Sequence, residues 1–168
     1  MHIRQAKVED AEQLLALYTP YVKETTITFE TQVPSVQEFQ SRIQTILDKF
    51  PYVVAEEADT ILGYAYAHTY YDRAAYDWTV ELSIYVDTKK TQVGIGNALY
   101  DALEEKLTQQ NIINFLACIS LPNEASICFH KKRGYEQIGH FKKVGFKFGQ
   151  WWDTVWMQKS LIKEEKDG

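Results

Sequence analysis

A glycine-containing segment, residues 92–97, has the residue types that point most directly to chemistry. It reads Gln-Val-Gly-Ile-Gly-Asn, follows an apolar run that ends at Val86, and leads into a strongly helical sequence. The first turn of a helix leaves about four backbone N–H groups unpaired and carries roughly half a positive charge. Glycines let a phosphate approach that backbone closely. We expect a phosphate-bearing ligand here, although an ordinary tight turn would have the same pattern.

Two familiar phosphate-binding motifs do not fit this segment. A P-loop requires GxxxxGK followed by Ser or Thr, and the sequence has no such run. A dinucleotide-binding fingerprint requires GxGxxG, and Leu99 stands three residues after Gly96 in place of the third glycine. We therefore expect a pyrophosphate on another kind of carrier.

Glu81 and His130 are the side chains best suited to move protons. Glu81 lies inside the apolar run 79–86, where partial burial would raise the pKa of its carboxyl toward a value useful for accepting a proton. A strand Glu that faces solvent or pairs with Arg73 would have the same sequence pattern. His130 lies in a short helical segment, and imidazole titrates near neutral pH. A solvent-exposed helical His is the alternative. We expect purely structural roles for the other histidines, His2, His68 and His140.

A strand, a helix and a second strand must position the glycine segment. The strand 78–86, the helix 97–109 and the strand 114–119 form a crossover unit, so the two strands should be parallel neighbours with a right-handed connection. The second strand is almost continuously apolar, as expected for a strand that is buried on both faces. The segment then lies at the carboxyl end of the first strand, where open α/β sheets place ligands.

The remaining pattern predicts an α/β domain with a mixed sheet, in the order β-α-α-β-β-β-α-β-α-β-β. Asp10 should cap a first amphipathic helix whose end Pro20 disturbs. Ser35 and Glu38 should form a capping box for a helix over 35–47. The other expected elements are strands at 3–6, 52–56, 61–68 (with a bulge at Gly63), 135–140 and 151–158, a helix at 125–132, and a basic aromatic loop at 142–150.

Length and composition fit one folded domain. The chain has 168 residues, of which 45% are hydrophobic, and a net charge of −5 argues against general nucleic-acid affinity. Cys118 and Cys128 have no metal-like spacing and are expected to be free thiols in a reducing compartment. No apolar run approaches the roughly 18 residues of a membrane span. We expect a cytoplasmic protein with a single domain over 1–162, a frayed tail at 163–168, and no metal, nucleic-acid or membrane partner.

The sequence resembles the GNAT superfamily of acyl-CoA-dependent N-acyltransferases, and within it the phosphinothricin acetyltransferase group. The resemblance covers nearly the whole chain in the family's order. The matching stretches are ETTITFE (24–30), GYAYA (63–67), RAAYDWTVELSIYV (73–86), the VGIGNAL loop, the LPNEAS and FHKKRGY segments (121–135) and VGFKFGQWWDTVWMQ (144–158). The resemblance implies a GNAT-like fold, in which helices flank a central mixed sheet.

The resemblance also implies acetyl-CoA as the co-substrate. The pyrophosphate would lie on residues 92–97, and the pantetheine arm would pair like an extra strand where two parallel strands splay. Asn123 would bind pantetheine or hold the splay open. Thr91 and Gln92 depart from the family's Arg/Gln and Gly, so Gln92 or Lys90 would supply the side-chain contact. The implied cofactor-binding residues are Ile84, Tyr85, Val86, Gln92, Val93, Gly94, Ile95, Gly96, Asn97 and Asn123.

For the chemistry, the resemblance implies Glu81 as the general base that takes a proton from the attacking amine. His130 stands where many members have a Tyr, and it would contact the substrate or protonate the departing thiolate. Arg73 could clamp a substrate carboxylate, and a surface Arg is the alternative. The implied substrate-binding residues are Phe29, Glu30, Arg73, Ala74, Ala75 and His130, with Lys147 and Phe148 at the pocket wall.

Together these features predict an acetyl-CoA-dependent N-acetyltransferase that acts by direct transfer on the α-amine of a small amino-acid-like acceptor. Phosphinothricin, methionine sulfoximine and methionine sulfone are the implied acceptors, and the resemblance implies a homodimer. A GNAT enzyme acting on a polyamine or a protein N-terminus is one alternative, weakly favoured by the acidic net charge. A non-catalytic acyl-CoA sensor is another, and the presence of both Glu81 and His130 argues against it.

Overall fold

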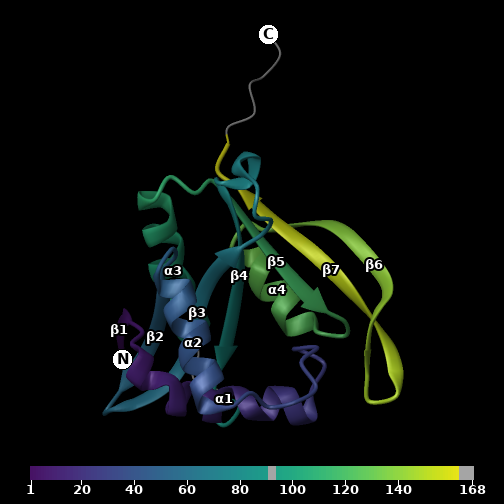
Figure 1. The fold of residues 1–168 in the computed structure, drawn as a ribbon. Coiled ribbons are helices and arrows are strands. Elements are labelled where there is room, and N and C mark those ends of the chain that lie inside the picture. The colour runs from purple at the N-terminus through teal and green to yellow at the C-terminus, as the bar shows by residue number, and fades with distance from the viewer. Residues whose placement is uncertain (91–93, 163–168) are drawn as a thin grey trace.

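A mixed β-sheet forms the centre of the computed structural model, which describes residues 1–90 and 94–162 (Figure 1). In this part of the chain the strands are β1 (His2–Gln5), β2 (Tyr52–Glu57), β3 (Thr60–Thr69), β4 (Thr79–Val86), β5 (Asn114–Ser120), β6 (Glu136–Lys147) and β7 (Gln150–Ser160). They lie in the order β1-β2-β3-β4-β5-β7-β6. Neighbours are antiparallel except for β4 and β5, which confirms the predicted parallel crossover pair.

Helices cover both faces of this sheet, as predicted for the mixed α/β class. The described residues include α1 (Ala11–Glu24), α2 (Val36–Leu47), α3 (Ile95–Gln109) and α4 (Glu124–Lys132), with short 3-10 helices η1 (Val8–Asp10) and η2 (Ala74–Tyr76). None of these helices is both long and apolar enough to cross a membrane. The predicted tail, 163–168, lies outside the described residues.

The alternation of β3 separates two hydrophobic cores. Tyr64 packs in the core that α1 and α2 share with the sheet, whereas Ala65 and Ala67 pack in the core under α3 and α4. Small residues on the second face let α3 lie close to the sheet, and large tyrosines fill the space under α1 and α2. The position of a residue in β3 or β4 therefore determines the face of the sheet on which its side chain lies.

The sheet opens between β4 and β5. Their pairing covers Thr79–Asn114, Val80–Phe115 and Glu81–Leu116, after which the two strands diverge (Figure 1). Beyond Glu81, β4 remains paired with β3, and β5 remains paired with β7. The backbone of each strand on the side of the gap is therefore available to a ligand.

Polar residues stand at the starts of three helices, and two of them cap their helix with a side-chain oxygen. The Ser35 hydroxyl accepts a hydrogen bond from the Glu38 N–H (3.1 Å), which is one half of the capping box predicted for α2, whereas the Glu38 carboxylate accepts from Arg42. The Asn123 Oδ1 accepts from the Ser126 N–H (3.2 Å) at the start of α4. Asp10 is the N-cap residue of α1, as predicted, but its side chain makes no cap bond, because its carboxylate accepts from the Arg4 guanidinium and the Lys7 N–H.

Some predicted element ends were wrong. α1 continues through Pro20 to Glu24, since proline removes one helical donor without ending a helix that packs on the core. The irregularity expected at Gly63 lies beside it: Ala55 pairs with Gly63, and Glu56 pairs with Ile61. α3 begins at Ile95, directly after the left-handed Gly94 (φ 102°).

The segment 142–150, predicted to be a loop, is mostly strand. β6 and β7 form a long hairpin that turns at Phe148 and Gly149, both with positive φ (54° and 72°). Such left-handed pairs match the twist of the flanking strands in tight hairpins. A register irregularity between Phe141 and Gly145 includes Lys143, which also has positive φ (51°). The basic residues of the segment 142–150 suggested a loop, although most of the segment belongs to strands whose side chains are largely exposed.

Candidate active site

The gap between β4 and β5 is lined by His130 and by Leu82, which follows Glu81 in β4. A narrow cavity there is bounded by the β4 backbone around Ser83 and Ile84, by β5, and by the Tyr100 and His130 side chains from α3 and α4. It lies where the resemblance places the pantetheine arm. Ile84 and Tyr85 line it, whereas the Val86 carbonyl accepts a hydrogen bond from the Tyr21 hydroxyl.

His130 is a buried, neutral side chain. It is 2% exposed, and its Nδ1 lies 2.8 Å from the Ser126 carbonyl oxygen. A carbonyl only accepts, so the proton is on Nδ1, and Nε2 accepts from the Tyr100 hydroxyl (2.9 Å). Burial lowers the pKa of the His130 imidazole. The ring therefore lines the gap without a free N–H, which differs from a solvent-exposed helical His.

Glu81 marks the point where the two strands separate, and it faces the α1 and α2 side of the sheet. Burial raises the pKa of its carboxyl, and the charge of nearby His68 opposes that rise. The His68 Nε2 lies 3.8 Å from the Glu81 Oε2 across the β3–β4 pair, so Glu81 pairs with His68 and not with Arg73. A partly buried carboxylate at the apex of the gap has the features of a general base.

The segment 25–30 approaches the same region and is held by hydrogen bonds. The Glu30 carboxylate accepts a two-bond contact from Arg42 (2.9 and 2.7 Å) and a hydrogen bond from the Tyr18 hydroxyl (2.7 Å). Arg42 holds the pKa of the Glu30 carboxyl below its usual range. Glu30 thus anchors the segment, because its charge is already neutralised by a side chain of α2.

The β6–β7 hairpin clamps this segment from the other side. The buried Lys147 donates from Nζ to the Thr28 carbonyl (2.8 Å), and burial lowers the pKa of its ammonium. The Phe29 ring lies against Gly145, where an added Cβ would come within 2.3 Å of it. Ser120 of β5 donates to the Thr26 carbonyl. Phe148 is exposed at the hairpin turn.

The segment before β4 carries the predicted residues on its surface and also places two tyrosines beside Glu81. Arg73, Ala74 and Ala75 are all exposed on η2 and its flank. Tyr70 and Tyr71 instead line a cavity of about 440 Å³ next to Glu81, together with Leu116, Ile138, Gly139, Phe141 and Trp156. Trp156 on β7 thus lines the same cavity as the catalytic candidate Glu81.

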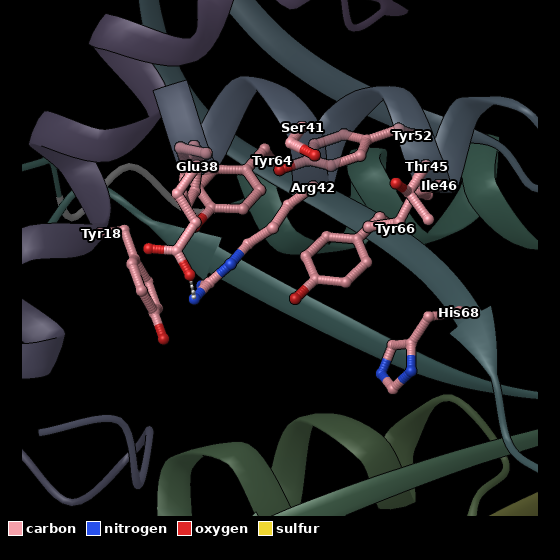
Figure 2. Close-up of a pocket in the computed structure, with 11 residues that line it drawn as sticks. Tyr18, Glu38, Ser41, Arg42, Thr45, Ile46, Tyr52, Tyr64, Tyr66 and His68 are labelled. Atoms are coloured by element: carbon pink, nitrogen blue, oxygen red, sulfur yellow. Dashed lines mark hydrogen bonds and ion pairs between the residues drawn. The ribbon is translucent and has the colours of Figure 1, made fainter. Parts of the chain in front are cut away.

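A larger groove, of about 480 Å³, opens between α2 and β3 (Figure 2). Arg42 reaches into it from α2, and Tyr66 and His68 reach into it from β3. Its remaining wall is formed by Tyr18, Glu38, Phe39, Ser41, Thr45, Ile46, Tyr52 and Tyr64. None of these was a predicted site residue, because a run of tyrosines at alternate positions looks the same as a buried strand.

The start of α3 retains the features expected of an anion site. Gly94 has a left-handed backbone, and an added Cβ there would meet nothing within 4 Å. Ile95 is buried beneath it, and a Cβ on Gly96 would press against Phe129 (3.2 Å). The Asn97 side chain accepts from Arg133 of α4 (3.0 Å). The predicted contacts of Gln92 and Val93 lie outside the described residues.

The comparisons with known proteins agree with this geometry. The profile of the acetyltransferase (GNAT) domain matches residues 3–156. A phosphinothricin N-acetyltransferase from Streptomyces viridochromogenes is 32% identical over 161 residues, covering 96% of this chain and 88% of the relative. An L-methionine sulfoximine/L-methionine sulfone acetyltransferase from Pseudomonas aeruginosa is 34% identical, covering 95% and 94%.

Solved structures share the fold over the same length. A phosphinothricin acetyltransferase from Sinorhizobium meliloti in complex with acetyl-CoA has a TM-score of 0.91 and 34% identity, covering 99% of this chain and 94% of that one. A putative acetyltransferase from Salmonella typhimurium with its cofactor acetyl-CoA has a TM-score of 0.92 and 26% identity, covering 100% and 98%.

The opened sheet, the carboxylate at its apex and these likenesses define an N-acetyltransferase, and the chain belongs to the GNAT family. Within the family it falls in the group of phosphinothricin and methionine sulfoximine acetyltransferases.

Proposed function

We propose that the protein transfers an acetyl group from acetyl-CoA to the α-amine of a small amino-acid-like acceptor. The observation that carries the proposal is the position of Glu81 at the apex of the gap between β4 and β5. The names of the relatives support an amino-acid analogue such as phosphinothricin, methionine sulfoximine or methionine sulfone as acceptor.

The residues present fit acetyl-CoA. The opened sheet offers the backbone at Ile84 and Tyr85 to an extended arm, and Gly94 leaves open space before the start of α3. We propose that Gly94, Ile95, Gly96 and Asn97 hold the pyrophosphate with backbone donors. When bound, acetyl-CoA supplies the thioester whose acetyl carbon the amine attacks.

We propose that Glu81 accepts the proton that makes the acceptor amine nucleophilic. Its raised pKa supports this role, because a carboxylate that binds a proton more tightly is a stronger base. On the α3 and α4 side, the Tyr100–His130 pair lines the gap where the thiolate would leave. The neutral His130 ring orients the Tyr100 hydroxyl, and we propose that this pair delivers the proton to sulfur.

The acceptor would lie on the side of Glu81, between the segment 25–30 and the loop before β4. Phe29 and the aromatic side chains near Glu81 supply apolar walls, and Arg73, Ala74 and Ala75 lie on the outer rim. Glu30 acts through its bonds with Arg42 and keeps this wall in place. We also propose a homodimer, as the resemblance implies.

The proposal is tested by release of free CoA thiol from acetyl-CoA with a panel of amines. The panel contains phosphinothricin, methionine sulfoximine, methionine sulfone, spermidine and a peptide with a free N-terminus. We expect release with the amino-acid analogues and little with the others. Release with the polyamine or the peptide alone would favour the other-amine alternative. Binding of acetyl-CoA without release for any amine would favour a sensor.

Glu81→Gln gives a sharper test of the base. The amide keeps the shape but accepts no proton, so kcat should fall about 100-fold or more, in the range typical of general-base catalysis. The affinity for acetyl-CoA, measured by calorimetry, should stay close to that of the wild type. Glu12→Gln, on an exposed position of α1, is the matched control. Unchanged kcat in Glu81→Gln would remove Glu81 as the base.

A further inference from the structure

His68 lies beside the proposed base, although a purely structural role was predicted for it. It is the cross-strand partner of Glu81 in the β3–β4 register, and the two side chains share one face of the sheet. The His68 Nε2 lies 3.8 Å from the Glu81 Oε2. The His68 side chain is 36% exposed and the Glu81 side chain 22%, so the imidazole is the more accessible of the two.

The pair also stands at the boundary between two cavities. Glu81 lines the cavity of about 440 Å³ beside Tyr70 and Trp156. His68 lines the groove of about 480 Å³ beneath α2, and Figure 2 shows its ring pointing into that groove from the same strand as Tyr66. A proton taken up by Glu81 therefore has a titratable side chain between it and the groove.

The other groups that face the pair do not compete for this proton near neutral pH. Burial raises the pKa of Tyr66 on β3, of Tyr70 in the loop before β4, and of Cys118 on β5, the last to about 11. All three are therefore neutral. Arg42 lines the groove, but its charge is paired with the carboxylates of Glu30 and Glu38.

We propose that His68 is a second catalytic residue, which passes the proton of the acceptor amine from Glu81 to the water of the groove. This rests on the proposed function. The acceptor ammonium gives one proton to the Glu81 carboxylate and becomes a neutral amine. The protonated carboxyl passes that proton to the His68 Nε2, which forms an imidazolium. The imidazolium releases a proton from Nδ1 to water, which leaves the remaining ring proton on Nε2. Exchange with the water of the groove moves that proton back to Nδ1, so both side chains return to their starting states.

The kinetic test compares His68→Gln with His2→Gln, the same change at an exposed position of the edge strand β1. We expect kcat of His68→Gln to fall about tenfold or more, since an assisted proton transfer is lost. Its acid limb of kcat/KM should move to higher pH, because the imidazolium no longer lowers the pKa of Glu81. Added imidazole should restore part of kcat in His68→Ala, through the open groove.

A second measurement needs no turnover. Carboxyl ¹³C NMR of labelled glutamate follows the titration of Glu81 in the wild type, His68→Gln and His2→Gln. We expect its midpoint to rise in His68→Gln alone. An unchanged midpoint would overturn the pairing, and an unchanged kcat with an unmoved acid limb would overturn the catalytic role. If the wild type acetylates no amine but the midpoint still moves, the pairing stands, and the proposed function and the proton path both fail.

Discussion

Tyr100 and His130 show how burial decides what a side chain can do. A helical His near neutral pH could have been an exposed acid, but the fold places it under α3 with both ring nitrogens bonded. Its lowered pKa keeps it neutral, so any proton delivered here must involve the Tyr100 hydroxyl. The hydroxyl itself is buried, and its pKa lies well above the usual range.

Tyr100→Phe should separate the structural part of this pair from its catalytic part. Loss of the hydroxyl leaves the buried His130 Nε2 without its donor, which should reduce the free energy of unfolding by about 1–3 kcal/mol. We also expect kcat to fall about tenfold or more if the pair protonates the thiolate. Urea unfolding and thiol release measure the two effects, with the exposed Tyr76→Phe as control. A stability loss with unchanged kcat would leave the pair a purely structural role.

Some residues of the site could be predicted from the sequence, and others could not. Glu81 was found because a carboxylate inside an apolar strand is unusual. His68, for which we propose a catalytic role, could not be predicted to lie beside Glu81. Their proximity depends on the β3–β4 register, which pairs residues 13 positions apart and is invisible in local patterns. Glu30 was implied as a substrate-binding residue, and the bond of its carboxylate with Arg42 could not be predicted, because that partner comes from another helix.

At the scale of elements, α4 depends on Asn123 at its start. Asn123 was expected to bind pantetheine or to hold the splay open, and the structure shows that it caps α4 and lines the gap. One side chain can thus serve both the helix and the ligand. The cap uses its Oδ1 and leaves the amide NH₂ available.

Two substitutions separate these roles. Asn123→Ala should reduce the free energy of unfolding by about 1 kcal/mol, since the cap is lost. Asn123→Asp should keep that stability, because a carboxylate oxygen caps equally well, but it should weaken acetyl-CoA binding if the NH₂ contacts pantetheine. Thermal unfolding measures the change in stability, and calorimetry measures the affinity for acetyl-CoA. Equal acetyl-CoA affinity in Asn123→Asp and the wild type would limit Asn123 to capping.

The β6–β7 hairpin and the segment 25–30 fit together at Gly145. An added Cβ would come within 2.3 Å of the Phe29 ring, so Gly145→Ala must displace the ring or the strand. We expect a loss of about 1–3 kcal/mol in the free energy of unfolding and a raised KM for the acceptor.

A double substitution tests the cause. Phe29→Ala should remove the clash, so Gly145→Ala should cost much less in that background. Gly139→Ala is the stability control on the same strand, since its Cβ would meet nothing within 4 Å. Equal costs of Gly145→Ala in both backgrounds would show that the Phe29 contact is not responsible.

The elements differ in how far the sequence could predict them. The crossover unit was predictable because β5 is buried and α3 is amphipathic, and both leave strong local patterns. The outer half of β6 could not be predicted, because nearly all of its side chains are exposed and no alternation of burial marks it as a strand. The short pairing of β4 with β5, over three residue pairs, has no local pattern in the sequence, because it is a contact between segments far apart in the chain.

At the scale of the whole molecule, the two ligand routes that we propose approach the sheet from opposite faces. The Tyr100–His130 pair belongs to the α3 and α4 side, whereas Glu81 and His68 face α1 and α2. The gap between β4 and β5 connects the two faces of the sheet. This arrangement suits direct transfer, because the acceptor and the thioester can approach the same point without exchanging places.

The hairpin also bears on the oligomeric state. Ile138, Phe141, Val144, Phe146 and Trp151 are each more than half exposed on it, at 51–59%. Apolar side chains gathered on one exposed element are typical of an interaction surface. The family resemblance implies a homodimer, and we propose that a second copy covers these side chains in a symmetric pair in which each hairpin contacts its partner.

Trp151→Lys should therefore shift the protein from dimer to monomer in sedimentation velocity at micromolar concentration. A buried charge in a symmetric interface is introduced twice, so one substitution acts on both sides of the contact. Trp78→Lys places the same change on an exposed tryptophan outside the hairpin and should leave the dimer intact. A monomeric wild type, or a dimer that tolerates Trp151→Lys, would contradict this interface. Because Lys147 and Gly145 of the same hairpin hold the segment 25–30, monomerisation should also raise the KM for the acceptor.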